Sequence, residues 1–337
     1  GYGIDAQLRG GTPADTGSTL PPATATVTRE TLVDTHTATG ELGYGDTTAL
    51  AARLGGTVTA VPPSGAVLKR GQALYRVDNT PVLLLYGSLP AYRPLSPGVE
   101  GTDVTQFEQN LYALGYRGFT VDDAYTASTA GAVKQWQDDL GLPETGTVEL
   151  GRVAYATGPV RVDTVQVTVG DALQPGKELF TYSGTSRLVT VELELSDQRL
   201  ARKGAAVKVT LPDSRTVAGK IAGVQTVIDA GDDDGGPGGE SDPETKLEVT
   251  VAVADKKALA GLDQASVEVV FAAAERKDVL TVPVAALLAL SEGGYGVEVV
   301  EGRKTRIVTV ETGLFANGRV EVSGDGLREG MTVGMPS

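Results

Sequence analysis

A short internal duplication limits the folds open to this chain more than any other feature. GAVLKRGQALY at 65–75 aligns without gaps on GDALQPGKELF at 170–180. In both copies two glycines stand six residues apart, and two leucines and a closing aromatic residue recur at matching positions. The glycines suit turns with positive φ, and the leucines and aromatic residues suit strands that face a common core. Because a single hairpin is marginal in water, we expect the two copies to pack against one another.

The segment between the two copies predicts two amphipathic helices. In the first helix, apolar residues recur at helical spacing at Val104, Phe107, Leu111 and Leu114. Gly115 is placed to end that helix. The second helix is expected from about 126 to 140, with Ala132, Val133, Trp136 and Leu140 on one face. Burying such side chains contributes about 1.5 to 3 kcal/mol each, so we expect this insert to have a small core of its own.

After the second copy, apolar and polar residues alternate, which is typical of half-buried β-strands. One run places Val189, Val191, Leu193 and Leu195 on one face, and another does the same with Leu247, Val249, Val251 and Val253. With VKVTL, AGKIAGVQTVI and SVEVVF, these runs predict about five antiparallel strands suited to a small barrel. The acidic, glycine-rich segment 229–243 interrupts them. We interpret it as a solvated hairpin loop, because its acids do not follow the spacing of a calcium-binding EF-hand.

The last part of the chain predicts another β unit. EGRK at 301–304 is expected to be a turn between two strands, and DGLREGM at 325–331 a loop with a short helical or 3₁₀ turn.

Composition and charge exclude several classes of function. The chain has 337 residues and a hydrophobic fraction of 41%, enough for two or three folded domains. Its formal charge of −14 gives no basic surface for a nucleic acid, and it disfavours anionic lipid surfaces. The Gly-, Pro- and Thr-rich segment 1–22 is interpreted as a flexible tether, and we expect a signal or anchoring segment upstream of it.

The residue types that carry most enzyme chemistry are scarce. Cysteine is absent and His36 is the single histidine, so a zinc site would have to consist mainly of carboxylates. No serine near His36 is marked as activated, and no phosphate-binding glycine loop occurs. In a chain this acidic, the adjacent carboxylates Asp122 and Asp123 are best explained by chance. We therefore predict that the chain is not an enzyme and has no cofactor or metal site.

The duplicated units resemble the two halves of the biotinyl/lipoyl-type β-hammerhead. In carrier proteins of that type a modifiable lysine occupies the hairpin between the halves. Here the insert replaces that hairpin, so covalent biotin or lipoate is not implied. A split lipoyl domain, a β-barrel and a final unit that begins VLTVPVAAL together resemble the HlyD/MacA-like periplasmic adaptor (membrane fusion protein) family, over nearly the whole chain from about Ala23.

This resemblance implies a mainly β, multidomain fold with a small inserted α-helical domain. The expected segments are a tether (1–22), strands that join the barrel and membrane-proximal domains (23–50), the first lipoyl-like half (51–90), the helical insert (91–152), the second lipoyl-like half (153–185), the β-barrel (186–274) and the membrane-proximal domain (275–337).

The insert, GTDVTQFEQNLYALGY followed by VDDAYTASTAGAVKQWQDDLGLPETGTV, resembles a small three-helix peptidoglycan-binding domain. It stands where adaptors usually carry a long coiled-coil hairpin. Asp123 and Thr126 replace glycines usual in that family, and ELGRVAYATGPV follows Val148 in place of a full third helix. For Tyr125 and Trp136 a core position is an alternative to a ligand contact. The candidate glycan-binding residues are Arg117, Asp122, Tyr125, Gln135 and Trp136.

The combination is similar to adaptors of Gram-positive, actinobacterial transporters that pair with a MacB-like permease. It implies a non-enzymatic, extracytoplasmic adaptor for efflux or export, tethered at the cell envelope and assembled as a ring, often a hexamer. The implied partners are an inner-membrane permease, either FtsX/MacB-like ABC or RND, and peptidoglycan. The alternative is a structural protein whose main activity is binding the cell wall. A wall hydrolase or transpeptidase is disfavoured by the lack of Cys and the single His.

Overall fold

The computed structural model describes residues 20–229 and 243–336. The expected tether falls almost wholly outside these residues, as does the expected acidic loop. The chain forms two compact units, one of residues 1–39, 192–248 and 268–337 and the other of residues 40–191 and 249–267. No helix in the part of the chain that the structure describes is long and apolar enough to cross a membrane.

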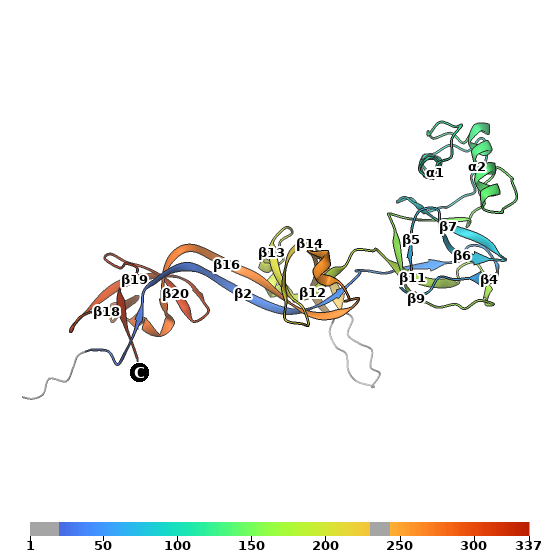
Figure 1. Cartoon of the computed structure of the whole chain (residues 1–337). Coiled ribbons are helices and arrows are strands. Elements are labelled where there is room, and N and C mark those ends of the chain that lie inside the picture. Colours follow the sequence, from blue (N-terminus) through green and yellow to red (C-terminus); the bar gives the residue numbers. More distant parts are fainter. Residues whose placement is uncertain (1–19, 230–242, 337) are drawn as a thin grey trace, which may run out of the picture. The chain divides into compact units, whose positions relative to one another are not determined.

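A two-sheet β-sandwich lies in the second unit (Figure 1). Its strands are β3 (Thr48–Ala51), β4 (Gly56–Ala60), β5 (Val67–Leu68), β6 (Ala73–Val77), β7 (Thr80–Tyr86), β8 (Val153–Ala156), β9 (Val160–Val165), β10 (Ala172–Leu173) and β11 (Glu178–Ser183). One sheet has the order β10-β4-β6-β7-β8, and the other has the order β3-β11-β9-β5. β8 pairs in parallel with β7, whereas the other pairs are antiparallel.

The duplication builds this sandwich by strand exchange, because each copy contributes a strand that pairs with the other half of the sandwich. β5, from the first copy, pairs with β9, and β10, from the second, pairs with β4. The N–H of Gly65 donates to the carbonyl of Val162 at 2.7 Å, and the N–H of Gly170 donates to that of Val58 at 2.8 Å. Both glycines have positive φ, 87° and 100°. The expectation that the two copies pack together is confirmed.

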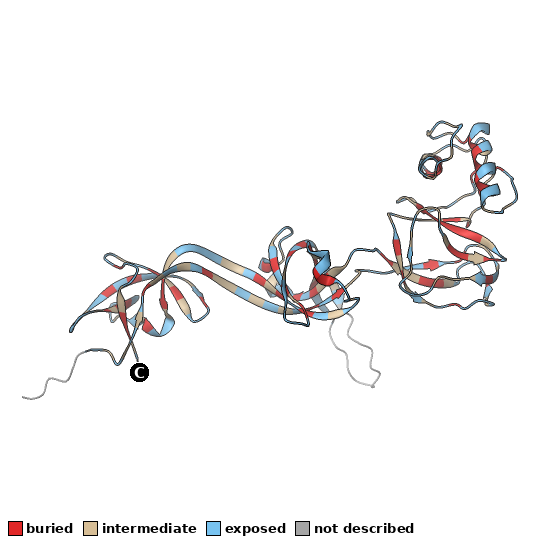
Figure 2. Ribbon diagram, in the orientation of Figure 1, coloured by how far each residue is buried: buried red, intermediate tan, exposed pale blue. Residues whose placement is uncertain are grey.

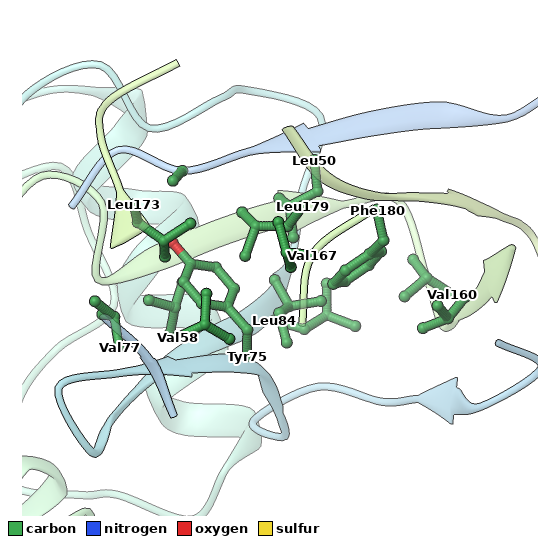
Figure 3. Packing of buried hydrophobic residues seen from close by; sticks show 14 residues of the cluster. Leu50, Val58, Tyr75, Val77, Leu84, Val160, Val167, Leu173, Leu179 and Phe180 are labelled. Carbon is green, nitrogen blue, oxygen red and sulfur yellow. The ribbon is translucent and has the colours of Figure 1, made fainter. Parts of the chain in front are cut away.

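Matching residues of the two copies meet in one core. Leu74 and Tyr75 from the first copy and Leu179 and Phe180 from the second are each at most 2% exposed. Figure 3 shows Tyr75 and Phe180 among aliphatic side chains from both sheets. The apolar positions shared by the repeats therefore contribute to the sandwich core, together with residues outside the repeats.

The helices of the insert lie close to the expected bounds. They are α1 (Thr102–Ala113) and α2 (Ala127–Asp139). Gly115, with φ of 102°, follows α1 as expected. Thr126 caps α2, and its hydroxyl accepts from the N–H of Thr129 at 3.3 Å. Threonine at position 126 thus has a defined capping role.

Strand β7 contributes to two cores at once. Val82 and Leu84 point into the sandwich core, whereas Leu83 and Leu85 point into the core of the helices. Figure 2 shows that buried residues run along most of this strand. The insert has the expected core, separate from that of the sandwich, but Leu83 and Leu85 of β7 and Val153 of β8 complete it. A strand covered on both faces reads as a continuous apolar run, as TPVLLLY does.

The remaining elements are mainly strands. They are β1 (Ala23–Thr26), β2 (Thr28–Gly43), β12 (Leu188–Glu194), β13 (Ala206–Thr210), β14 (Thr216–Asp229), β15 (Glu244–Val253), β16 (Ala265–Pro283), β17 (Leu288–Ala289), β18 (Tyr295–Glu301), β19 (Lys304–Ala316), β20 (Arg319–Ser323) and β21 (Thr332–Met335). Short 3₁₀ helices occur at Leu195–Leu200, Lys256–Leu259 and Val284–Ala286.

The predicted barrel strands are present. The order β16-β13-β14-β15-β12-β2, with a further pairing of β2 with β16, closes the barrel. The alternating pattern is confirmed along β15 and along β12 as far as Leu193. Leu195 departs from it: this residue begins a 3₁₀ helix and is 47% exposed, so it does not share the buried face of β12.

The C-terminal strands surround a separate core of valines, with members such as Val297, Val299 and Val320. β18 and β19 form the expected hairpin, with Gly302 in its turn at φ of 65°. Residues 325–331 form turns and contain no helical segment, so the expected helical or 3₁₀ turn there is wrong. The glycines at both ends of this segment have positive φ, which favours turns.

Candidate functional site

The helical module, residues 91–152, contains most of the buried polar side chains in the described part of the chain. Glu108 of α1 is fully buried. One carboxylate oxygen accepts from the hydroxyl of Thr129 at 2.6 Å, and the other accepts from the N–H of Asp122 at 2.9 Å. Burial raises the pKa of Glu108, and the two hydrogen bonds oppose that rise. Glu108 thus ties α1 to the start of α2 and to the loop before it.

Two amide side chains on α1 fasten the module to the end of β7 and to the chain just after it. The side chain of Asn110 accepts from the N–H of Tyr86 at 2.8 Å and donates to its carbonyl at 2.7 Å. One turn earlier, Gln106 accepts from the N–H of Leu89 at 3.1 Å and donates to its carbonyl at 2.8 Å. These pairs replace strand hydrogen bonds where the chain leaves the sandwich. They set the position of α1 over the sheet.

An ion pair fixes the loop that leads into α1. The guanidinium of Arg93 donates two hydrogen bonds to the carboxylate of Asp103, at 2.7 and 2.9 Å, and a third to the carbonyl of Glu100 at 2.7 Å. The bonds from Arg93 lower the pKa of Asp103. Asp103 also stands in the first turn of α1, where a negative charge is favourable.

At the end of the module, the side chain of Gln137 bonds to the main chain, as Asn110 and Gln106 do near its start. Its side chain accepts from the N–H of Gly146 at 2.9 Å and donates to the carbonyl of Thr147 at 2.9 Å. The hydroxyl of Tyr125 donates to the carbonyl of Gly146 at 2.6 Å. The segment that returns to β8 is therefore held in place by side chains.

Two of the five candidate glycan-binding residues lie in the core. Tyr125 and Trp136 are each 2% exposed, and the Trp136 ring meets Phe107 edge-on with 5.7 Å between ring centroids. Their aromatic faces stabilise the module. Of the two readings that the sequence left open for them, the structure favours the core position.

The other three candidates are exposed. Asp122 accepts from the N–H of Ala124 at 2.9 Å, and Gln135 lies on the outer face of α2. The Arg117 guanidinium stands 3.7 Å from the ring centroid of Tyr112 and donates to the carbonyls of Tyr112 and Tyr116 at 2.7 and 2.8 Å. The structure does not join Arg117, Asp122 and Gln135 by any hydrogen bond or ion pair among the described residues.

The sequence reasoning missed Tyr112. Its ring is 51% exposed and carries the Arg117 guanidinium on one face. Nearby, the hydroxyl of Tyr116 donates to Asp139 at 2.7 Å, which links the end of α1 to the end of α2. We call Tyr112, Tyr116, Arg117 and Asp139 the tyrosine platform. The signal that could have found it is Tyr112 itself, an aromatic residue outside the apolar stripe of its helix.

No group of three or more potential metal ligands occurs within residues 20–229 and 243–336. His36 lies on β2 with its Nε2 3.7 Å from the carboxylate of Asp197, and its side chain is 40% exposed. Asp122 serves as a turn acceptor, and Asp123 accepts through its carbonyl from the N–H of Gly101 at 2.8 Å.

Comparison with known proteins identifies the module first. The family model described as "Putative peptidoglycan binding domain" matches residues 100–149. That range holds α1, α2 and all five residues proposed from the sequence. No curated protein matches the chain.

Solved structures match almost the whole chain. MacA from Actinobacillus actinomycetemcomitans is 16% identical, with a TM-score of 0.55, and the match covers 93% of this chain and 99% of MacA. A MacA-MexA chimera with the Pseudomonas aeruginosa MexA α-hairpin domain is 18% identical, with a TM-score of 0.47 and 90% and 96% covered. ZneB from Cupriavidus metallidurans is 15% identical, with a TM-score of 0.38 and 92% and 91% covered.

The chain therefore has the multidomain β fold of MacA-like periplasmic adaptors, also called membrane fusion proteins. Within that fold it carries a peptidoglycan-binding-type domain between the two halves of its sandwich.

Proposed function

We propose that this protein is a non-enzymatic, extracytoplasmic adaptor subunit of an efflux or export transporter. The observation that carries the proposal is the likeness to MacA over 93% of the chain, which includes the exchanged-strand sandwich, the barrel and the C-terminal β unit. We further propose that the helical module faces the cell wall, in place of a coiled-coil hairpin. In this account the protein is tethered at the cell envelope, and several copies form a ring, with six as the expected number.

The proposed partner is an inner-membrane ABC permease of the FtsX/MacB-like type, with an RND permease as the alternative. Co-purification with each candidate permease tests this choice. The full chain should be retained by one of them and should raise its ATPase or transport activity. A folded chain that binds neither permease and stimulates neither would contradict the proposal.

A second function, binding of peptidoglycan by the module, is supported by the family match at 100–149. In this account the tyrosine platform, with Asp122 and Gln135, contacts the glycan. An exposed tyrosine offers a flat apolar face, and the neighbouring polar groups can bond to hydroxyls.

Sedimentation with purified peptidoglycan tests this second function. Tyr112→Ala and Arg117→Ser should each reduce the bound fraction several-fold. Tyr92→Ala is the matched control, because Tyr92 is equally exposed, at 54%, and also lies beside an arginine, Arg93. Equal loss in all three variants, or in none, would contradict a glycan site on the tyrosine platform. Retained transport with lost sedimentation would separate the two proposed functions.

A further inference from the structure

An open groove runs along one side of the sandwich. A cavity of about 330 Å³ is lined in part by Asp46, Ser183 and Tyr155, and a second of about 250 Å³ is lined in part by Leu50 and Tyr155. Both cavities also share Tyr182, so they adjoin and form one groove. Its walls are β3 and β8, and we call it the β3–β8 groove.

Strand β3 is the last strand of its sheet, and half of its main-chain groups face the groove side. The N–H of Ala52 donates to Lys177, and its carbonyl accepts from Gly176, both at 2.8 Å, so Ala52 faces β11. Because direction alternates along an antiparallel strand, the N–H and C=O groups of Ala49 and Ala51 face the free edge.

Strand β8 is likewise the last strand of the other sheet. Its bonds to β7 include the N–H of Leu83 to the carbonyl of Arg152 at 3.0 Å and the N–H of Gly87 to that of Ala156 at 2.9 Å. By the alternation of a parallel pair, the main-chain groups of Val153 and Tyr155 point away from β7. Both walls of the groove thus offer strand donors and acceptors.

Both edge strands are short, at four residues each, but neither carries a charged side chain or a proline. Natural edges are blunted by lysine, proline, bulges or inward-pointing charges. β3 reads TALA and β8 reads VAYA, so both edges are uncharged, free of proline and rich in alanine. Small side chains let another main chain approach closely.

The two ends of the groove carry opposite charges. Asp46, before β3, lines the larger cavity, and Arg53, after β3, lines the smaller one. Both are exposed, and neither has a hydrogen bond or ion pair among the residues that the structure describes. The extended chain between them spans roughly 20 Å, the length of about six residues of strand. Tyr75 and Val82 form part of an apolar lining between the charged ends.

We propose that the β3–β8 groove binds an extended segment of a partner protein, about six residues long, as an added strand. The segment carries a cationic group at the Asp46 end, a carboxylate at the Arg53 end and uncharged residues between them. Main-chain pairing provides affinity, and the two end charges select the segment. This inference does not depend on the proposed transport function.

Binding of capped hexapeptides to the full-length chain tests whether the charges at the two ends of the groove select the bound segment. The probe acetyl-KAVAVE-amide should bind at least about tenfold more tightly than KAVAVK or EAVAVE in the same caps, a difference of about 1.4 kcal/mol. Arg53→Glu should switch the preference to KAVAVK, and Asp46→Lys should switch it to EAVAVE. Both substitutions are at exposed positions without partners, so the fold is kept. Equal affinities for the three peptides, or an unchanged order in both variants, would overturn the proposal.

The main-chain part of the proposal has its own test. In an added strand only every second N–H group pairs with the edge. N-methylation of the odd-numbered or of the even-numbered residues of the peptide should therefore abolish binding in one case and leave it intact in the other. On binding, the amide signals of Ala49 and Ala51 or of Val153 and Tyr155 should shift, and those of exposed Ala172 on β10 should not. Equal effects of both methylation patterns would overturn strand addition. Occupation of the groove by a second copy, seen as self-association that peptide does not reverse, would also overturn it.

Discussion

Leu84 and Leu85 are adjacent in sequence but lie in different cores. Leu84 packs with Tyr75 and Phe180 inside the sandwich, and Leu85 packs with Phe107 and Trp136 under the helices. A single strand therefore joins the core of the two-sheet sandwich to the core of the helical module. The module is part of the structure of the second unit, and its core is incomplete without β7.

Truncating Leu85 should destabilise the module and the sandwich together. Leu85→Ala removes a side chain that is 1% exposed, and large-to-small changes of this kind cost about 2 to 5 kcal/mol. Urea unfolding should be followed by Trp136 fluorescence and by far-UV circular dichroism. Both signals should show the same decrease in the free energy of unfolding. Val67→Ala is the control, because Val67 is 49% exposed, and it should change little. Two separate transitions, with only the fluorescence transition shifted, would contradict a shared core.

Asn110→Ala should weaken the attachment of α1 to the sheet. The substitution leaves the N–H and carbonyl of Tyr86 without the bonds they now make at 2.8 and 2.7 Å. Leaving such groups unpaired costs about 1 to 3 kcal/mol. Thermal unfolding should show a lower melting temperature than for Gln135→Ala, whose side chain is exposed on α2. Equal melting temperatures would show that the Asn110 bonds do not hold the module.

The two equivalent repeat glycines Gly71 and Gly176 should respond unequally to alanine. Both have positive φ, 82° and 93°, so each substitution carries a backbone cost of about 1 to 2 kcal/mol. A Cβ added at Gly71 would also stand 2.6 Å from a methyl carbon of Leu114. A Cβ added at Gly176 would have no neighbouring atom within 4 Å. Gly71→Ala should therefore be the more destabilising in chemical unfolding. The opposite order would contradict the packing of Leu114, the residue that follows α1, against the first repeat.

Glu108 predicts a defined pH dependence. Burial raises its pKa in the folded state, so between the unfolded and folded pKa values the folded protein binds more protons than the unfolded chain. Its contribution to the free energy of unfolding is therefore present below the ordinary glutamate pKa and is lost as the pH rises through the raised value.

Urea unfolding of wild type and Glu108→Gln at pH 4 and pH 7 tests this sign. Other carboxylates, including Asp103 with its lowered pKa, titrate in both proteins and cancel in the difference. The stability of wild type relative to Glu108→Gln should be greater at pH 4 than at pH 7. A relative stability that is constant or rises with pH would contradict the account.

Local patterns predicted much of this fold from the sequence. The repeat glycines predicted turns, and the leucines and aromatic residues of both copies predicted a shared core, because turn geometry and strand alternation are local properties. The apolar stripes predicted α1 and α2 to within a residue or two at their ends. The alternation failed at Leu195, where the 3₁₀ helix begins and the next side chains leave the strand pattern.

Contacts between residues that lie far apart along the chain could not be predicted from the sequence. The run Val82 to Leu85 has the same apolar character whether a strand covers one core or two, so the sharing of β7 could not be predicted. The hydrogen bonds between Asn110 and Tyr86 and between Arg93 and Asp103 could not be predicted either. The first pair is 24 residues apart along the chain, and the second spans the loop before α1. Of the five candidate site residues, the structure leaves Arg117, Asp122 and Gln135 exposed. It buries the other two, Tyr125 and Trp136.

The most direct test of the adaptor account is a titration of the full-length chain against a MacB-like ABC permease in lipid nanodiscs, with ATPase rate as the readout. The account predicts saturable stimulation, and Leu85→Ala, a folding variant, should lose it in proportion to its unfolded fraction. A parallel titration against an RND permease in proteoliposomes, with transport as the readout, covers the alternative partner. A folded, full-length chain that neither binds nor stimulates either permease would contradict the account.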